Sequence, residues 1–72
     1  MSDNHVAKVI EVVGTSGESI EDAIQTALKR TAKTVNNLQW FKVAEVRGAL
    51  NEDGSIERYQ VILKIGFGLN DD

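Results

Sequence analysis

The residues of this chain that can take part in chemistry suit a binding site better than a catalytic one. The 72-residue sequence has no cysteine and one histidine, His5, which lies close to the N-terminus. It therefore offers no nucleophile beside a base and no thiolate or imidazole cluster for a metal. Most carboxylates fall at a helix start, in a turn or in the C-terminal tail, where acids are normally solvated. We expect a protein that is not an enzyme and has no metal site.

Trp40, the only tryptophan, is the most informative residue. Its indole suits a core, an interface or a stacking platform for a planar ligand. Trp40 and Phe41 are consecutive on a predicted strand, so their rings point to opposite faces. Phe41 shares its parity with Val43, and both are expected to face the helix. Trp40 then faces outward, so its remaining possible roles are in a subunit interface or in a ligand site.

Gln60 is predicted to face outward on the neighbouring strand. Its carboxamide places a donor beside an acceptor, as the edge of a pyrimidine-like ring requires, although an ordinary solvent-facing glutamine is the simpler interpretation. Lys8 and Arg47 are the cations that can meet a ligand phosphate. Arg47 can equally pair with Glu45 or Glu57, an exposed contact worth at most about 1 kcal/mol.

The elements that position these residues follow from the apolar pattern. Val6 to Val13 is rich in β-branched residues and stops at the turn cluster Gly14-Thr15-Ser16-Gly17, which predicts a strand. This cluster lacks the lysine of a phosphate-binding P-loop. Apolar residues at three- and four-residue steps predict a helix from about Ser19, a good N-cap, to Asn37. Asn36-Asn37 suits the left-handed conformation that ends a helix.

Two further strands are predicted, Trp40 to Leu50 and Ile56 to Leu69, with hairpin turn chemistry at Asp53-Gly54. The alternate residues of the last strand that should face the helix are Tyr59, Val61, Leu63, Ile65, Phe67 and Leu69. The order is β-α-β-β in one α+β domain over residues 1–72, with an ordered core of about residues 5–69.

The size and charge of the chain favour self-association. One core of this length rarely yields more than about 3–5 kcal/mol of stability, and no disulfide can add to it. The strands are apolar on both faces, which predicts that partner chains cover the second face. A net charge of −3 argues against nucleic-acid binding. Without a signal sequence or a long apolar run, we expect a soluble, cytoplasmic protein away from membranes.

An ordered set of short motifs resembles the dodecin family. The set runs from about Val6 to Leu69 and consists of Val12-Val13-Gly14-Thr15-Ser16, Ser19-Ile20-Glu21-Asp22-Ala23-Ile24, Ala32-Lys33-Thr34, Trp40-Phe41-Lys42-Val43, Val46-Arg47-Gly48, Tyr59-Gln60-Val61 and Lys64-Ile65-Gly66-Phe67.

The resemblance implies a curved three-stranded antiparallel sheet wrapped around the helix, and twelve chains in a hollow shell. It also implies that flavins (riboflavin, FMN or related isoalloxazines) bind in pairs between subunits. Trp40 matches the family's stacking tryptophan and Gln60 the glutamine at the flavin's pyrimidine edge, while Arg47 and Lys8 match positions near the ligand's polar end. The implied role is flavin storage, buffering and photoprotection.

The sequence departs from many dodecins at Gln39, at Asn36 and Asn37, and at Gly68, where relatives carry charged residues. These losses argue against coenzyme A as a second ligand and favour riboflavin over FMN. The alternative is a structural or cation-binding shell that takes no flavin.

Overall fold

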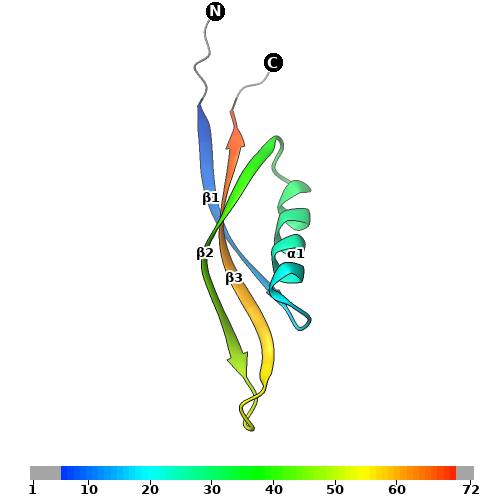
Figure 1. Cartoon of the computed structure of the whole chain (residues 1–72). Helices are drawn as coiled ribbons and strands as arrows, with labels where there is room; N and C mark the ends of the chain where they lie inside the picture. The colour runs from blue at the N-terminus through cyan, green and yellow to red at the C-terminus, as the bar shows by residue number, and fades with distance from the viewer. Residues whose placement is uncertain (1–5, 70–72) are drawn as a thin grey trace, which may run out of the picture.

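The computed structural model describes residues 6–69 and contains one helix packed on a three-stranded antiparallel sheet (Figure 1). The predicted β-α-β-β order is confirmed, with elements β1 (Ala7–Ser16), α1 (Ile20–Ala32), β2 (Leu38–Leu50) and β3 (Ile56–Gly68). The sheet order is β1-β3-β2, so β3 is central and antiparallel to both neighbours. His5 lies outside the described residues.

Strand β1 ends at Ser16, so the predicted stop at Val13 is wrong. Gly14, Thr15 and Ser16 continue the ladder with β3, because pairing there satisfies their backbone groups. Gly14 also lets α1 approach closely. A Cβ at this position would overlap the carbonyl oxygen of Ala23 and lie 2.9 Å from the Cβ of Ala27. Tertiary packing here outweighs local turn chemistry.

Helix α1 begins as predicted but ends at Ala32, five residues before Asn37. Ser19 is the N-cap, and its hydroxyl accepts a hydrogen bond from the backbone N–H of Asp22 at 2.9 Å. Beyond Ala32 the chain makes one further turn, in which the N–H groups of Thr34 and Val35 both donate to the Thr31 carbonyl, at 3.1 and 2.9 Å. Asn37 does adopt the left-handed conformation, with φ 67°, but within the connection to β2.

The β2–β3 hairpin is close to its predicted form. β2 begins two residues before Trp40, at Leu38, and β3 ends at Gly68 rather than Leu69. Gly54 has a positive φ of 91°, the conformation that glycine supplies in such turns. The predicted turn is confirmed.

The core lies where α1 crosses the sheet. Ala23 and Ala27 of α1 pack against Val61, Leu63 and Ile65 of β3, and these three strand residues are fully buried. The small helix residues bring α1 close to the sheet. Around this centre pack the partly buried residues Ile10, Val12, Ile24, Leu28, Leu38 and Val43. The predicted helix-facing set is confirmed at its centre, while Tyr59 and Phe67 are only half-buried and Leu69 is exposed beyond the end of β3.

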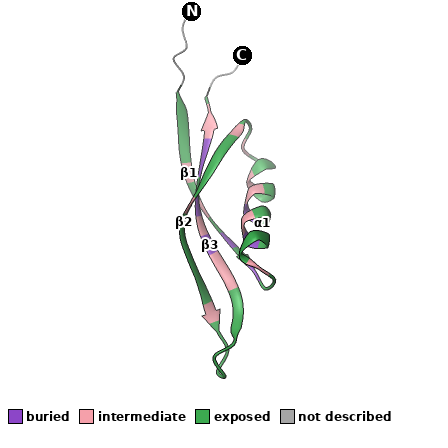
Figure 2. Cartoon of the chain, in the orientation of Figure 1, coloured by how far each residue is buried: buried purple, intermediate pink, exposed green. Residues whose placement is uncertain are grey.

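Much apolar surface remains uncovered. The β2–β3 hairpin extends past the first turn of α1, and β2 is exposed along most of its length (Figures 1 and 2). The large hydrophobic residues that stay exposed are Val6, Val9, Val13, Ile20, Trp40, Phe41, Val46, Leu50, Ile56 and Leu69. Within residues 6–69, no helix is long and apolar enough to cross a membrane.

Candidate functional site

The indole of Trp40 lies over Gly66 on the face of the sheet away from α1. Trp40 is the register partner of Gly66, and the two share the face opposite that of Leu63 and Ile65. A Cβ at Gly66 would collide with three indole ring atoms, so the glycine makes room for the ring. The predicted outward orientation of Trp40 is confirmed, and 47% of the residue is exposed.

Phe41 faces the helix side, as predicted from its parity. It is the register partner of Ile65 and borders an apolar groove together with Leu28 and Ala32 of α1. The groove leaves Phe41 46% exposed. Adjacent aromatic residues of β2 therefore present open surface on both faces of the sheet.

A β-bulge in β2 decides which way Arg47 points. By strict alternation from Trp40, Arg47 would face α1. The register shifts by one residue between Val43 and Glu45, however, and this reverses the orientation of the side chains from Glu45 to Ala49, up to the next irregularity before Leu50. Arg47 is consequently the partner of Gln60 and shares its face. No glycine or turn signal in this part of the sequence indicates the bulge.

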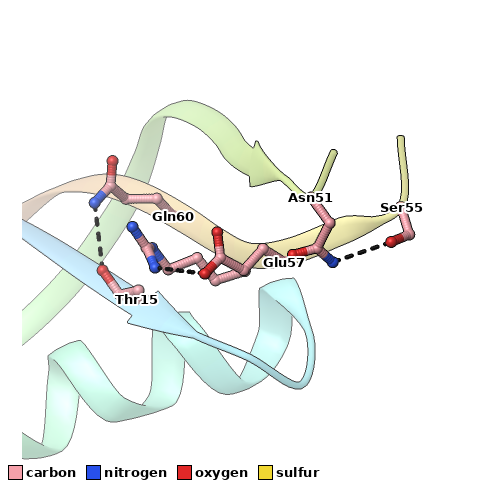
Figure 3. Close-up of polar contacts among 6 residues, drawn as sticks. Thr15, Asn51, Ser55, Glu57 and Gln60 are labelled. Atoms are coloured by element: carbon pink, nitrogen blue, oxygen red, sulfur yellow. Dashed lines mark hydrogen bonds and ion pairs between the residues drawn. The ribbon is translucent and has the colours of Figure 1, made fainter. Parts of the chain in front are cut away.

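Both polar atoms of the Gln60 carboxamide have a hydrogen-bond partner. Arg47 Nε donates to Gln60 Oε1 at 2.8 Å, and Gln60 Nε2 donates to Thr15 Oγ1 at 3.4 Å. Figure 3 shows the second of these contacts, from β3 to β1. Gln60 is half-buried rather than an ordinary solvent-facing residue. Thr15 was not indicated by the sequence, because it lay in the predicted turn.

The ion pairs considered for Arg47 do not form. Among residues 6–69, the salt bridge found joins Arg58 Nη1 to Glu57 Oε2 at 3.4 Å, and both side chains are about half exposed. Arg47 instead donates to a neutral carboxamide. Its guanidinium lies on the same face as Trp40 and Gln60, and within residues 6–69 no carboxylate forms a salt bridge with it.

Trp40 and Gln60 share a face but are not brought together within one chain. The partner of Trp40 on β3 is Gly66, six residues from Gln60. At about 3.3 Å per strand residue, Gly66 and Gln60 are about 20 Å apart along β3. We call these two strand positions the Trp40 level and the Gln60 level. This separation exceeds the length of the fused rings of a flavin, so one chain cannot stack a flavin on Trp40 and bind its edge through Gln60.

Lys8 does not lie on the face that carries Trp40 and Gln60. Its register partner is Phe67, which places it on the α1 side of the sheet near one end of β3. Within one chain the structure therefore does not group Lys8 with Trp40, Gln60 or Arg47. Any contact between Lys8 and a ligand on the Trp40 face would have to come from a neighbouring chain.

Two lysines that the sequence pattern did not indicate lie between the Trp40 and Gln60 levels. Lys64 of β3 is opposite Lys42 of β2 on one side and Glu11 of β1 on the other, and all three are exposed. Like charges directly opposite each other are unfavourable by themselves. This part of the face is suited to an anionic group.

Comparisons with known proteins agree on one family. The family model described as Dodecin matches residues 6–70. The chain is 50% identical over 66 residues to the dodecin of Thermus thermophilus, covering 92% of this chain and 94% of that protein.

Solved structures give the same result. The dodecin from Streptomyces coelicolor matches with a TM-score of 0.88 and 39% identity, covering 99% of this chain and 100% of the other. The calcium dodecin from Mycobacterium tuberculosis, described as having a novel calcium-binding site, matches with a TM-score of 0.77 and 31% identity, covering 93% of this chain and 94% of the other. Within residues 6–69 of this chain, no three His, Cys, Asp or Glu side chains gather where they could hold a metal ion.

Proposed function

The chain belongs to the dodecin family, and we propose that it binds riboflavin or FMN between copies of itself, as a homododecameric shell. The observation that carries the proposal is the half-exposed indole of Trp40 on a face that its own helix leaves open. A planar ring is free to stack there without any rearrangement of the core.

The ligand site is completed by neighbouring chains. Because Trp40 and Gln60 are about 20 Å apart along one sheet, the flavin stacks on Trp40 of one chain and meets Gln60 of another. Uncovered apolar residues on both faces of the sheet support such an assembly. Lys8, Lys42 and Lys64 supply positive charge for the phosphate of FMN, while Arg47 donates to Gln60 at the pyrimidine edge.

The chemical role we propose is storage, buffering and photoprotection of flavin. An electron-rich indole in contact with an isoalloxazine quenches its excited state by rapid electron transfer. The site offers no residue that would act on a substrate, so binding rather than turnover is the proposed activity. The absence of cysteine suits a reducing compartment, and we place the protein in the cytoplasm.

Riboflavin titration tests the proposal. Wild-type protein is expected to quench riboflavin fluorescence, and tryptophan fluorescence should fall in parallel. Stacking of a planar heterocycle on an aromatic side chain is worth about 1–3 kcal/mol, so Trp40→Ala should weaken binding about 5- to 150-fold. Gln25→Ala, at an exposed helix position away from this face, should bind as wild type does.

Two results would contradict flavin binding. One is riboflavin fluorescence that stays unchanged in the presence of assembled wild-type protein. The other is equal affinity in wild type and Trp40→Ala. The first result would favour the shell that takes no flavin. Calcium binding is described for the M. tuberculosis relative, and no observation on this chain favours it.

A further inference from the structure

A row of three polar side chains crosses the sheet at the level of Gln60 and uses all three strands. Thr15 of β1 and Arg47 of β2 are both register partners of Gln60, so the three side chains lie side by side on the face away from α1. The distances are 2.8 Å from Arg47 Nε to Gln60 Oε1, and 3.4 Å from Gln60 Nε2 to Thr15 Oγ1.

Arg47 determines which way the carboxamide faces, and Thr15 gives the NH₂ group a partner in that orientation. A guanidinium has only donors, so Arg47 must meet the oxygen of Gln60 and not its NH₂ group. A hydroxyl can accept, so Thr15 can meet the NH₂ group. Turning the carboxamide over would place two donors against each other at Arg47. One orientation is therefore favoured before any ligand arrives.

The held carboxamide retains one free donor and one free acceptor. Nε2 has two hydrogens, of which Thr15 takes one, and Oε1 has two lone pairs, of which Arg47 takes one. A primary carboxamide has one N–H on the same side as its oxygen, so an N–H and a lone pair can meet one ligand edge together. A ring edge with a carbonyl beside an N–H, as in a lactam or cyclic imide, pairs with both.

We propose that Thr15 is a positioning residue, which together with Arg47 holds the Gln60 carboxamide in one orientation and so makes the site selective for ligands with a carbonyl next to a ring N–H. This inference rests on the proposed flavin binding. It adds that the ligand's carbonyl lies toward β1 and its N–H toward β2. Thr15 itself need not touch the ligand.

Binding of two ligands to three proteins tests the inference. The ligands are riboflavin and 3-methylriboflavin, whose imide N–H is blocked; the proteins are wild type, Thr15→Val and Thr15→Ser. Valine keeps the shape and removes the hydroxyl, and Val13 already occupies the same face of β1. Serine keeps the hydroxyl.

Wild type should bind riboflavin at least about tenfold more tightly than 3-methylriboflavin, because the methylated ring leaves the acceptor of Gln60 unpaired. Thr15→Val should weaken riboflavin binding about three- to tenfold and leave 3-methylriboflavin binding unchanged, so the selectivity falls. Thr15→Ser should keep the wild-type preference for riboflavin over 3-methylriboflavin. Wild-type selectivity in Thr15→Val, or an equal loss for both ligands, would overturn the inference.

Ligand-free crystal structures separate this inference from the proposed function. In wild type, Gln60 should occupy one conformer with Nε2 at Thr15; in Thr15→Val it should occupy several. A wild type that binds no riboflavin but holds Gln60 in this way would contradict flavin binding and leave the positioning role supported. A ligand-free wild type in which Gln60 points away from Thr15 would contradict the positioning role, whatever the flavin result.

Discussion

At the scale of single residues, the pairing of Gly66 with Trp40 shapes the stacking surface. The glycine is buried beneath the indole because it has no side chain to keep the ring away from the strand. The ring then lies close to the β3 backbone, and 47% of Trp40 stays exposed. Among the aromatic residues of β2, this arrangement distinguishes Trp40 from Phe41, whose register partner is the buried Ile65 on the α1 side of the sheet.

We predict that Gly66→Ala displaces the indole and weakens flavin binding about tenfold, since the stacking surface is worth about 1–3 kcal/mol. The new Cβ would overlap the ring of Trp40, and the indole is free to move toward solvent. Tryptophan emission of the ligand-free protein should shift to longer wavelength, and a riboflavin titration gives the affinity.

Gly17→Ala is the control for this change, because nothing lies within 4 Å of a Cβ at that position. It should leave both the emission and the affinity as in wild type. Unchanged riboflavin affinity in Gly66→Ala would show that the position of the indole over β3 is not required for binding.

At the scale of elements, the contact between β1 and α1 depends on Gly14. We predict that Gly14→Ala lowers the free energy of unfolding by about 1–3 kcal/mol, the usual cost of overpacking. The added Cβ would meet the Ala23 carbonyl oxygen, which belongs to the helix backbone and cannot turn aside. Denaturant unfolding measures the loss.

Gly17→Ala is the control, because it lies three residues later in open space. It should unfold as wild type does. Equal stability of Gly14→Ala and Gly17→Ala would refute the close contact.

The β2–β3 turn has a pH-dependent component at Asp53. Ser55 donates to Asp53 Oδ1 through its hydroxyl at 2.6 Å and its backbone N–H at 3.0 Å. These two bonds, the side-chain one first, lower the pKa of Asp53 from its ordinary value of 3.8. Since the folded pKa is the lower one, the stabilisation is present above pH 3.8 and is lost as the pH falls through the folded pKa.

We therefore predict that Asp53→Ala lowers the melting temperature slightly at neutral pH, and that this difference from wild type shrinks in acid below pH 3.8. Thermal unfolding across a pH series measures it. Glu52→Ala removes an acid from the same turn and is the control. A difference for Asp53→Ala that stays constant down to low pH would show that the carboxylate charge is not involved.

At the scale of the whole molecule, the small core and the exposed apolar residues both favour burial against partner chains. The core contains five hydrophobic side chains, and two of them are alanines. Phe41 and its groove lie open beside α1, while Trp40 and Val13 lie open on the other face. We infer that assembly covers these surfaces and stabilises the fold in the same step.

We predict that Phe41→Glu breaks the assembly into smaller species and weakens flavin binding, although Trp40 and Gln60 are untouched. Burial of a phenylalanine is worth about 2 kcal/mol, so the melting temperature should fall by about 8–16 °C. Native mass measurement with and without riboflavin records both effects. Gln25→Glu adds the same charge at an exposed helix position. It should change neither the mass of the assembly nor the flavin affinity. Full flavin affinity in a monomeric variant would contradict a site shared between chains.

The sequence by itself determined the order of elements, the hairpin turn and the outward direction of Trp40 and Gln60. Each of these depends on local signals: apolar periodicity, an Asp-Gly pair, and the alternation of side chains along a strand. The same signals placed the end of β1 too early and the end of α1 too late, because strand pairing and helix packing outweigh turn and helix propensities at those ends.

Only the tertiary structure decided how the polar residues meet. The register shift between Val43 and Glu45 turns Arg47 toward Gln60, and the continuation of β1 past Val13 brings Thr15 to its other side. Both depend on which backbone groups of β3 pair with which neighbours, a long-range choice that no local pattern specifies. The same register separates Trp40 from Gln60, and for that reason the proposed flavin site requires more than one chain.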